Sequence, residues 1–126
     1  MKFELAPDVK KRLSKIQSKL KLPHIEINRI ISFRSYGSRS RARARIWGFP
    51  KIWQLALNLP SYYCIEVLSE KFDRLTENNQ TRVLIHELMH IPKNFSGALI
   101  PHRGRGKVKI NFQSVEVFFR KYQKNK

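Results

Sequence analysis

The chain has 126 residues, enough for one globular domain with a single core and too few for two, so we expect one domain over 1–126. Lys and Arg number 26 against 9 Asp and Glu, a formal net charge of +17, and the 41% hydrophobic content excludes a disordered chain. The apolar runs are too short to span a bilayer and the N-terminus lacks a secretory signal, so we expect a soluble, cytoplasmic protein without a membrane partner. The lone Cys64 excludes an intramolecular disulfide and a thiolate zinc cage.

The first half of the chain predicts a helix followed by a sheet. Between Pro7 and Pro23, apolar residues recur at steps of four, three and four, the pattern of one buried helical stripe. Apolar runs and two-residue alternation predict strands over 24–33, 41–49, 52–59 and 62–68. The segments 41–49 and 52–59 flank Gly48-Phe49-Pro50 and therefore predict a hairpin. In the strand over 24–33, one face is expected to carry Ile25, Ile27, Ile31 and Phe33.

The second half predicts two helices. The segment 78–92 places Leu84, Leu88 and Ile91 on one side and ends at a proline. Residues 108–122 step by four, three, four and three through apolar side chains. The expected fold class is α+β, with an N-terminal helix, a three- to four-stranded antiparallel or mixed sheet and two later helices. We expect a core that includes Trp47, Trp53 and the phenylalanines.

The first of these two helices, 78–92, carries an HExxH motif, His86-Glu87-Leu88-Met89-His90. A spacing of four places both imidazoles on one helix face about one turn apart, where two nitrogens can bind one zinc ion. Glu87 is turned roughly 100° around the helix, so it can reach a water on the metal without ligating the metal. As general base it takes the proton of that water and returns it to the leaving amine. The motif predicts zinc-dependent hydrolysis of peptide bonds.

A catalytic zinc site needs three protein ligands and one open position. His102 lies twelve residues after His90, across a loop long enough for the chain to double back, and is the favoured third ligand. Glu116 on the last helix is the alternative, which would make a His-His-Glu site. His24 is interpreted as a surface or strand-end residue.

The segments LIHELMHIP and FSGALIPH resemble the phage metallopeptidase family, small zincin-like proteins, with the SprT-like proteases as the broader comparison. The resemblance covers roughly residues 42–122. It implies two histidine ligands and a catalytic glutamate within HELxHIP, and a downstream Pro-His segment that completes the metal site. In this chain those residues are His86, His90, Glu87 and His102. The implied fold is a minimal zincin.

By the same resemblance, an edge strand of the sheet runs beside the metal cleft and pairs with an extended substrate. Either 52–59 or 62–68 would be that edge strand. Zincins also supply a group that stabilises the oxyanion, and the candidates here are Arg103, Arg105 and Tyr122. Tyr122 continues the apolar stripe of the last helix, which favours a packing role.

The basic residues suggest an alternative function. Two zones could contact phosphates, one on the Arg-rich segment and one in the loop after His102, and together they comprise Arg34, Arg39, Arg41, Arg43, Arg45, Arg103 and Arg105. A basic nucleic-acid-binding module with a structural or vestigial metal is therefore the second hypothesis. A solvated strand face that discourages edge aggregation is the competing interpretation of the arginines.

Overall fold

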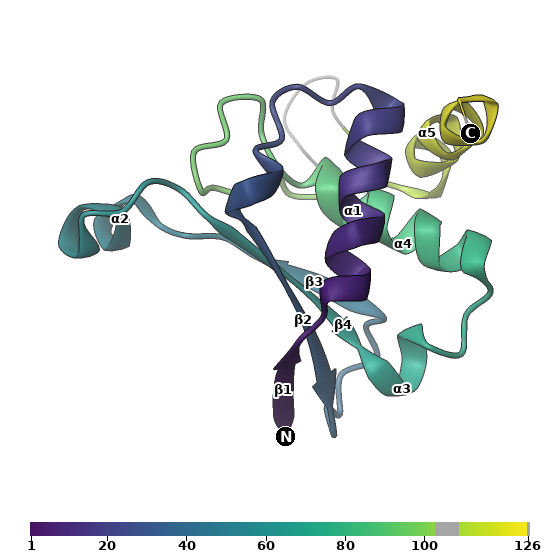
Figure 1. Ribbon diagram of the computed structural model, residues 1–126, viewed down its shortest axis with the longest axis horizontal. Coiled ribbons are helices and arrows are strands. Elements are labelled where there is room, and N and C mark those ends of the chain that lie inside the picture. Colours follow the sequence, from purple (N-terminus) through teal and green to yellow (C-terminus); the bar gives the residue numbers. More distant parts are fainter. Residues whose placement is uncertain (103–108, 126) are drawn as a thin grey trace.

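The structure, a computed structural model, describes residues 1–102 and 109–125, which form an α+β fold around a four-stranded mixed sheet (Figure 1). The strands lie in the order β1-β2-β4-β3. The central pair β2 and β4 is parallel, and both edge strands pair antiparallel to their neighbours. The strands are β1 (Lys2–Leu5), β2 (Ile30–Tyr36), β3 (Ala44–Trp47) and β4 (Tyr63–Leu68).

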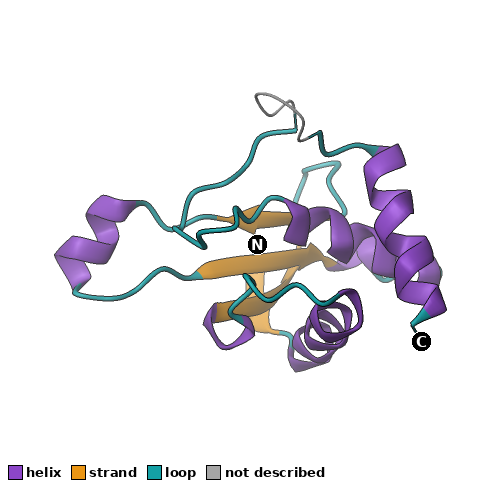
Figure 2. Ribbon diagram, turned by 90° about the horizontal axis from the view of Figure 1, so that it is seen from above, coloured by secondary structure: helices purple, strands orange, loops and turns teal. Residues whose placement is uncertain are grey.

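The described residues also form three longer helices and three short ones. They are α1 (Pro7–Leu20), the 3-10 helix η1 (Ile27–Arg29), α2 (Lys51–Leu57), α3 (Ser69–Phe72), α4 (Glu77–Met89) and α5 (Phe112–Lys124). The helix α2 stands at one end of the molecule and α5 at the other (Figure 1, Figure 2). Among the described residues, no helix combines the length and apolar character that crossing a membrane requires.

The core lies between one face of the sheet and the helices α1 and α4. The buried stripe predicted for α1 packs there, as do Leu84, Ile85 and Leu88 of α4. The sheet contributes Ile30 and Ile65 from its two central strands. This packing turns the apolar side of α4 inward, and it leaves the opposite side of α4 beside β3 at the edge of the sheet.

The prediction of a strand over 52–59 is wrong, because this segment contains α2. Pro50 precedes the helix and Asn58 ends it in a left-handed conformation. The predicted hairpin with 41–49 is therefore wrong as well. Trp53 on α2 and Trp47 at the end of β3 are both more than half exposed, not in the core. Four phenylalanines also lie outside the core, the exposed Phe3 and Phe112 and the half-buried Phe33 and Phe49.

Strand assignments differ from expectation in four further ways. The segment 24–33 begins as a turn and η1, so β2 starts at Ile30, and the buried face carries Ile30 and Ser32 while Ile31 is exposed. The strand β4 forms where predicted, but it is central and cannot be the edge strand. The edge beside α4 is β3, a shorter strand than the predicted 41–49. The N-terminal edge strand β1 was not predicted.

Candidate metal centre

The helix α4 presents the HExxH motif because its two ends and its apolar side fix its orientation. The side chain of Thr76 caps the first turn by accepting a hydrogen bond from the backbone N–H of Asn79 at 3.2 Å. The buried residues of α4 face the core, so His86 and His90 point from the other side toward a cavity. The predicted helix over 78–92 is confirmed, with bounds Glu77–Met89.

Three histidines meet at this cavity. One ring nitrogen from each of His86, His90 and His102 lies within 4.8 Å of the others. The Nε2 atoms of His86 and His102 are 3.0 Å apart. Three nitrogens on a tetrahedral zinc ion lie about 3.4 Å apart, since each Zn–N bond is about 2.0–2.1 Å. The cluster therefore fits a zinc-sized ion after small side-chain shifts.

The electrostatics of the cluster favour neutral imidazoles, the form that binds metal. Burial, followed by the neighbouring rings of His90 and His102, lowers the pKa of His86 to about 4. Burial also lowers the pKa of His90, and this outweighs the opposing hydrogen bond with the carbonyl oxygen of Ile100. At neutral pH neither ring needs to lose a proton before it binds a cation.

The loop that carries His102 is paired with the end of α4. The backbone N–H of Ile100 donates to the carbonyl of His90 at 2.8 Å, and Nδ1 of His90 lies 2.5 Å from the carbonyl oxygen of Ile100. With a proton on Nδ1, His90 donates to this carbonyl and keeps Nε2 free to bind a metal. This reciprocal contact orients one candidate ligand, His90, and brings the chain back toward the helix for another, His102.

Glu87 lines the same cavity, which has a volume of about 760 Å³. Its side chain is only 7% exposed, and this burial raises its pKa to about 8. A cation held by the adjacent histidines would offset that burial and favour the carboxylate. The cavity lies between β3 and α4, and its walls include Ala44, Ile46, Leu99 and Val115.

The other predicted candidates lie elsewhere. Glu116 pairs with Arg82 at 3.1 Å and is outside the histidine group. Tyr122 is buried in the core, as the apolar stripe predicted. His24 is not in the group either. Arg103 and Arg105 lie outside the described residues.

Comparison with known proteins agrees with this geometry. The family model described as putative phage metallopeptidase matches residues 1–126. The chain belongs to this metallopeptidase family. The match extends beyond the motif region to the N-terminal helix and the Arg-rich segment, which the motifs alone left unassigned. No curated protein and no solved structure matches the chain.

In this member of the metallopeptidase family, the loop before His102 is fastened by residues that the motif does not include. The hydroxyl of Tyr63 donates to the carbonyl of Ala98 at 2.7 Å and accepts from the N–H of Gly97 at 2.8 Å. Gly97 has a φ of +95°, a conformation that favours glycine. Glycine at 97 was the sequence signal for this turn, but its partner across the fold could not be identified from the sequence.

The arginines of the predicted basic zone in the Arg-rich segment fall into two groups, those that form ion pairs with other described residues and those that do not. Arg34 bridges Asp8 and Asp73, and Arg45 pairs with the buried Glu66 at 3.0 Å. These two arginines therefore form ion pairs within the fold. Arg39, Arg41 and Arg43 remain exposed on the connection between β2 and β3, and Arg43 also lines the histidine cavity.

Proposed function

We propose that this chain is a zinc-dependent endopeptidase. The observation that carries the proposal is the meeting of three imidazole nitrogens within 4.8 Å, with the buried Glu87 in the same cavity. A bound zinc would supply a Lewis acid and a water of lowered pKa. His86, His90 and His102 would hold the ion and leave one position open.

Glu87 would act as the general base. It follows His86 on α4 and so faces the cavity without joining the ligand group. The carboxylate accepts the proton of the attacking water and delivers it to the nitrogen of the leaving amine, as the chemistry of amide hydrolysis requires. The surrounding burial keeps bulk water from competing for that proton.

An extended peptide would bind along β3. This strand is at the edge of the sheet, and residues 42–46 line the cavity beside α4. An edge strand offers unpaired backbone N–H and C=O groups, with which a substrate can form an added strand. The edge strand of the proposal is therefore β3, in place of 52–59 or 62–68.

The test combines metal content with proteolysis. Purified, dialysed wild-type chain should hold about one zinc per chain, and His86→Ala should lose it. The wild type should cleave casein, and a chelator should stop the cleavage. Glu87→Gln should retain the metal and lose cleavage, because it keeps the shape of the side chain without its basicity. Equal cleavage by this variant would refute the role of Glu87.

A second candidate function is nucleic-acid binding beside the same cavity. The supporting observation is the group of exposed arginines Arg39, Arg41 and Arg43 in a chain of net charge +17. Among the described residues, no ion pair involves these three side chains. We propose that they contact phosphates, and that the metal site then acts on proteins held near nucleic acid.

A further inference from the structure

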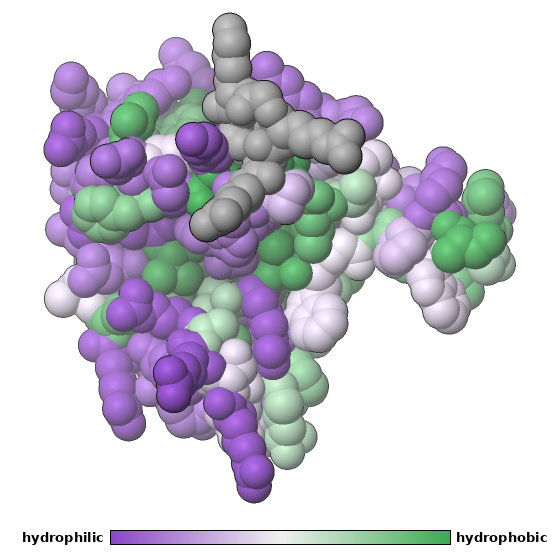
Figure 3. Space-filling model, turned by 180° about the vertical axis from the view of Figure 1, so that it is seen from behind, coloured by the Kyte–Doolittle hydropathy of each residue, from purple (hydrophilic) through white to green (hydrophobic). Residues whose placement is uncertain are grey.

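The helix α2 turns its apolar side to solvent, the reverse of an ordinary surface helix. At 100° per residue, its polar residues Lys51, Gln54 and Asn58 share one side. The apolar side chains occupy the rest of the circumference, and their exposed fractions are 71% for Ile52, 55% for Trp53, 67% for Leu55, 53% for Leu57 and 45% for Leu59. Figure 3 shows this helix as a projection with hydrophobic residues at its tip. We call residues 48–62 the arm.

The arm is joined by hydrogen bonds to the segment that precedes the cavity residue Leu99. The Nε2 of Gln54 donates to the carbonyls of Phe49 at 2.9 Å and Ser96 at 2.8 Å, and the N–H of Phe49 donates to the carbonyl of Gly97 at 2.8 Å. A Cβ added to Gly48 would lie 2.6 Å from the same Gly97 carbonyl, so the two segments are in close contact. Gln54, the buried residue on the polar side of α2, thus anchors the helix, and the apolar side is left for a partner.

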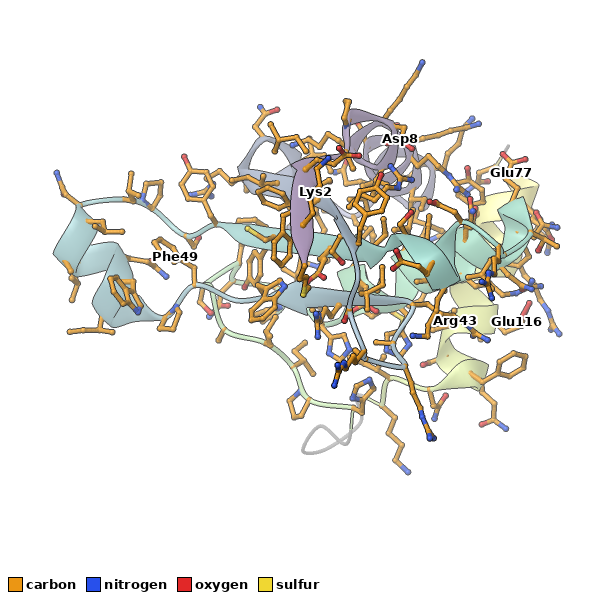
Figure 4. All side chains as sticks on the ribbon, turned by 90° about the horizontal axis from the view of Figure 1, so that it is seen from below. Lys2, Asp8, Arg43, Phe49, Glu77 and Glu116 are labelled. Carbon is orange, nitrogen blue, oxygen red and sulfur yellow. The ribbon has the colours of Figure 1, made fainter. Side chains whose placement is uncertain are left out.

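The arm is also continuous with the walls of the cavity. It follows directly from β3, with Phe49 at its base and Arg43 toward the other end of the strand (Figure 4). Leu99, which is 41% exposed, lines the cavity and would lie 3.3 Å from a Cβ at Gly48. A chain that leaves the cavity along β3 therefore crosses Leu99 and reaches the arm.

Charge distinguishes among the partners that an apolar arm could take. Within residues 46–65 only Lys51 is charged, in a chain whose charged fraction is 28%. An anionic lipid surface is bound through clusters of basic residues beside the apolar ones, which this segment lacks. A second copy carries the same net charge of +17 and is repelled. An unfolded polypeptide with apolar side chains needs no basic cluster on the arm and does not carry the charge that repels a second copy.

We propose that the arm binds an apolar segment of the polypeptide substrate, on the N-terminal side of the bond to be cut. This inference rests on the proposed peptidase function. A substrate paired antiparallel to β3 runs opposite to it, so its N-terminal part lies toward the arm. To reach from a position opposite Ile46 to one opposite Ile52, an extended substrate needs about six residues, each of which advances the chain by about 3.3 Å. The substrate class is therefore unfolded protein with exposed apolar residues at least about six positions before the cut.

The probe is β-casein, which is unfolded, and mass spectrometry of its products locates the first bond cut. Two peptides of equal length then span that bond, one with Leu and Phe at six to nine positions before it and one with Ser there. The arm variant is Ile52→Gln with Leu55→Gln. The control is Val117→Gln on α5, which is 67% exposed like Leu55. All of these positions are on the surface, so the melting temperature should not change.

The arm variant should raise KM for the apolar peptide about tenfold, because it lacks two apolar side chains that the bound peptide would partly bury. It should leave kcat for the apolar peptide and both kinetic constants for the serine peptide unchanged. The control should behave as wild type. An equal KM for the apolar peptide in the arm variant and wild type would overturn the inference. The inference would also be overturned if the arm substitutions changed only the sedimentation of the chain, which reports self-association, or only its flotation with vesicles, which reports lipid binding.

A failure of the peptidase proposal gives a different result from a failure of this inference. If wild type does not cleave casein, no bond is located, and a fluorescein-labelled peptide that carries Leu and Phe at four consecutive positions is titrated into Glu87→Gln with and without the arm substitutions. If fluorescence anisotropy shows that the chain with the intact arm binds this peptide about tenfold more tightly than the chain with the arm substitutions, the inference is supported independently of turnover. Equal binding refutes it.

Discussion

The surroundings of Glu66 favour the charged form of its carboxyl group. It lies on β4, almost completely buried, and accepts hydrogen bonds from the hydroxyl of Ser35 at 2.5 Å, from Nε of Arg45 at 3.0 Å and from Nε1 of Trp47 at 3.0 Å. Burial alone would raise the pKa of Glu66, but these hydrogen bonds outweigh it, and the pKa lies below its ordinary value of 4.5. The carboxylate joins the two strands β2 and β3 to the one between them.

This arrangement predicts a pH-dependent loss of stability. Because the pKa of Glu66 is lower in the folded state, its contribution is complete above about pH 4.5 and is lost as the pH falls through the folded value. Glu66→Gln should lower the free energy of unfolding at pH 7 by about 1–3 kcal/mol. In urea titrations at pH 7 and pH 3, the gap between wild type and variant should narrow at the lower pH. A constant gap would contradict the assignment.

The third ligand is testable at the same scale. His102→Ala should weaken zinc affinity by more than about a hundredfold, beyond the effect of losing an outer hydrogen-bond partner. Glu116→Ala should not, because Glu116 pairs with Arg82. His24→Ala controls for the loss of any imidazole. Competition with a chromophoric chelator measures all three, and equal affinities in the first two variants would remove His102 from the site.

At the scale of elements, hydrophobic periodicity predicted those helices whose apolar residues are buried. The stripes of α1 and α4 face the core, and so do Val115, Phe119 and Tyr122 of α5, whereas Phe112 at the start of α5 is exposed. The arm helix α2 fails this test, because its apolar residues face solvent and their order in the sequence carries no information about a core. The short strand β1 is exposed along its length and is held only by pairing with β2, which no local pattern reveals.

The same contrast applies to the site. The spacing of His86 and His90 follows from helix geometry, and the length of the next loop was enough to suggest His102. The contacts that fasten the loop join residues far apart in the chain, such as Tyr63 and Gly97. Local sequence identifies the candidate ligands, whereas their alignment in space depends on the complete fold.

Gly97→Ala tests whether this loop positions the metal site. A Cβ there would lie 2.2 Å from the carbonyl oxygen of Phe49, at a φ of +95°, so the segment must shift. We expect zinc affinity to fall about tenfold, the lower range for disturbed ligand orientation. Gly37→Ala is the matched control, because its φ is +82° but the nearest atom to its Cβ is 3.7 Å away. Equal zinc affinity in the two variants would separate the loop from the site.

For the whole molecule, four of the nine acidic residues are neutralised by ion pairs within the described part of the chain. Asp8 and Asp73 pair with Arg34, Glu66 pairs with Arg45 and Glu116 with Arg82. The excess positive charge therefore stays on the surface and gives the molecule a long-range attraction for polyanions. Arg43, which is exposed and lines the cavity, places part of this charge beside the candidate metal site.

Replacing Arg39, Arg41 and Arg43 by alanine should reveal whether this local group or the total charge binds nucleic acid. If each contacts a phosphate, the slope of log affinity against log salt for duplex DNA should decrease in magnitude by about three, since each contact contributes about 0.9.

The matched control replaces the exposed Lys11, Lys15 and Lys121, which removes the same charge from α1 and α5. Fluorescence anisotropy between about 50 and 200 mM salt covers the range in which such contacts weaken strongly. A similar change in slope for both triple variants would mean that net charge alone attracts DNA. A change confined to the arginine variant would place the polyanion beside the metal cavity, where cleavage of a DNA-bound protein could occur.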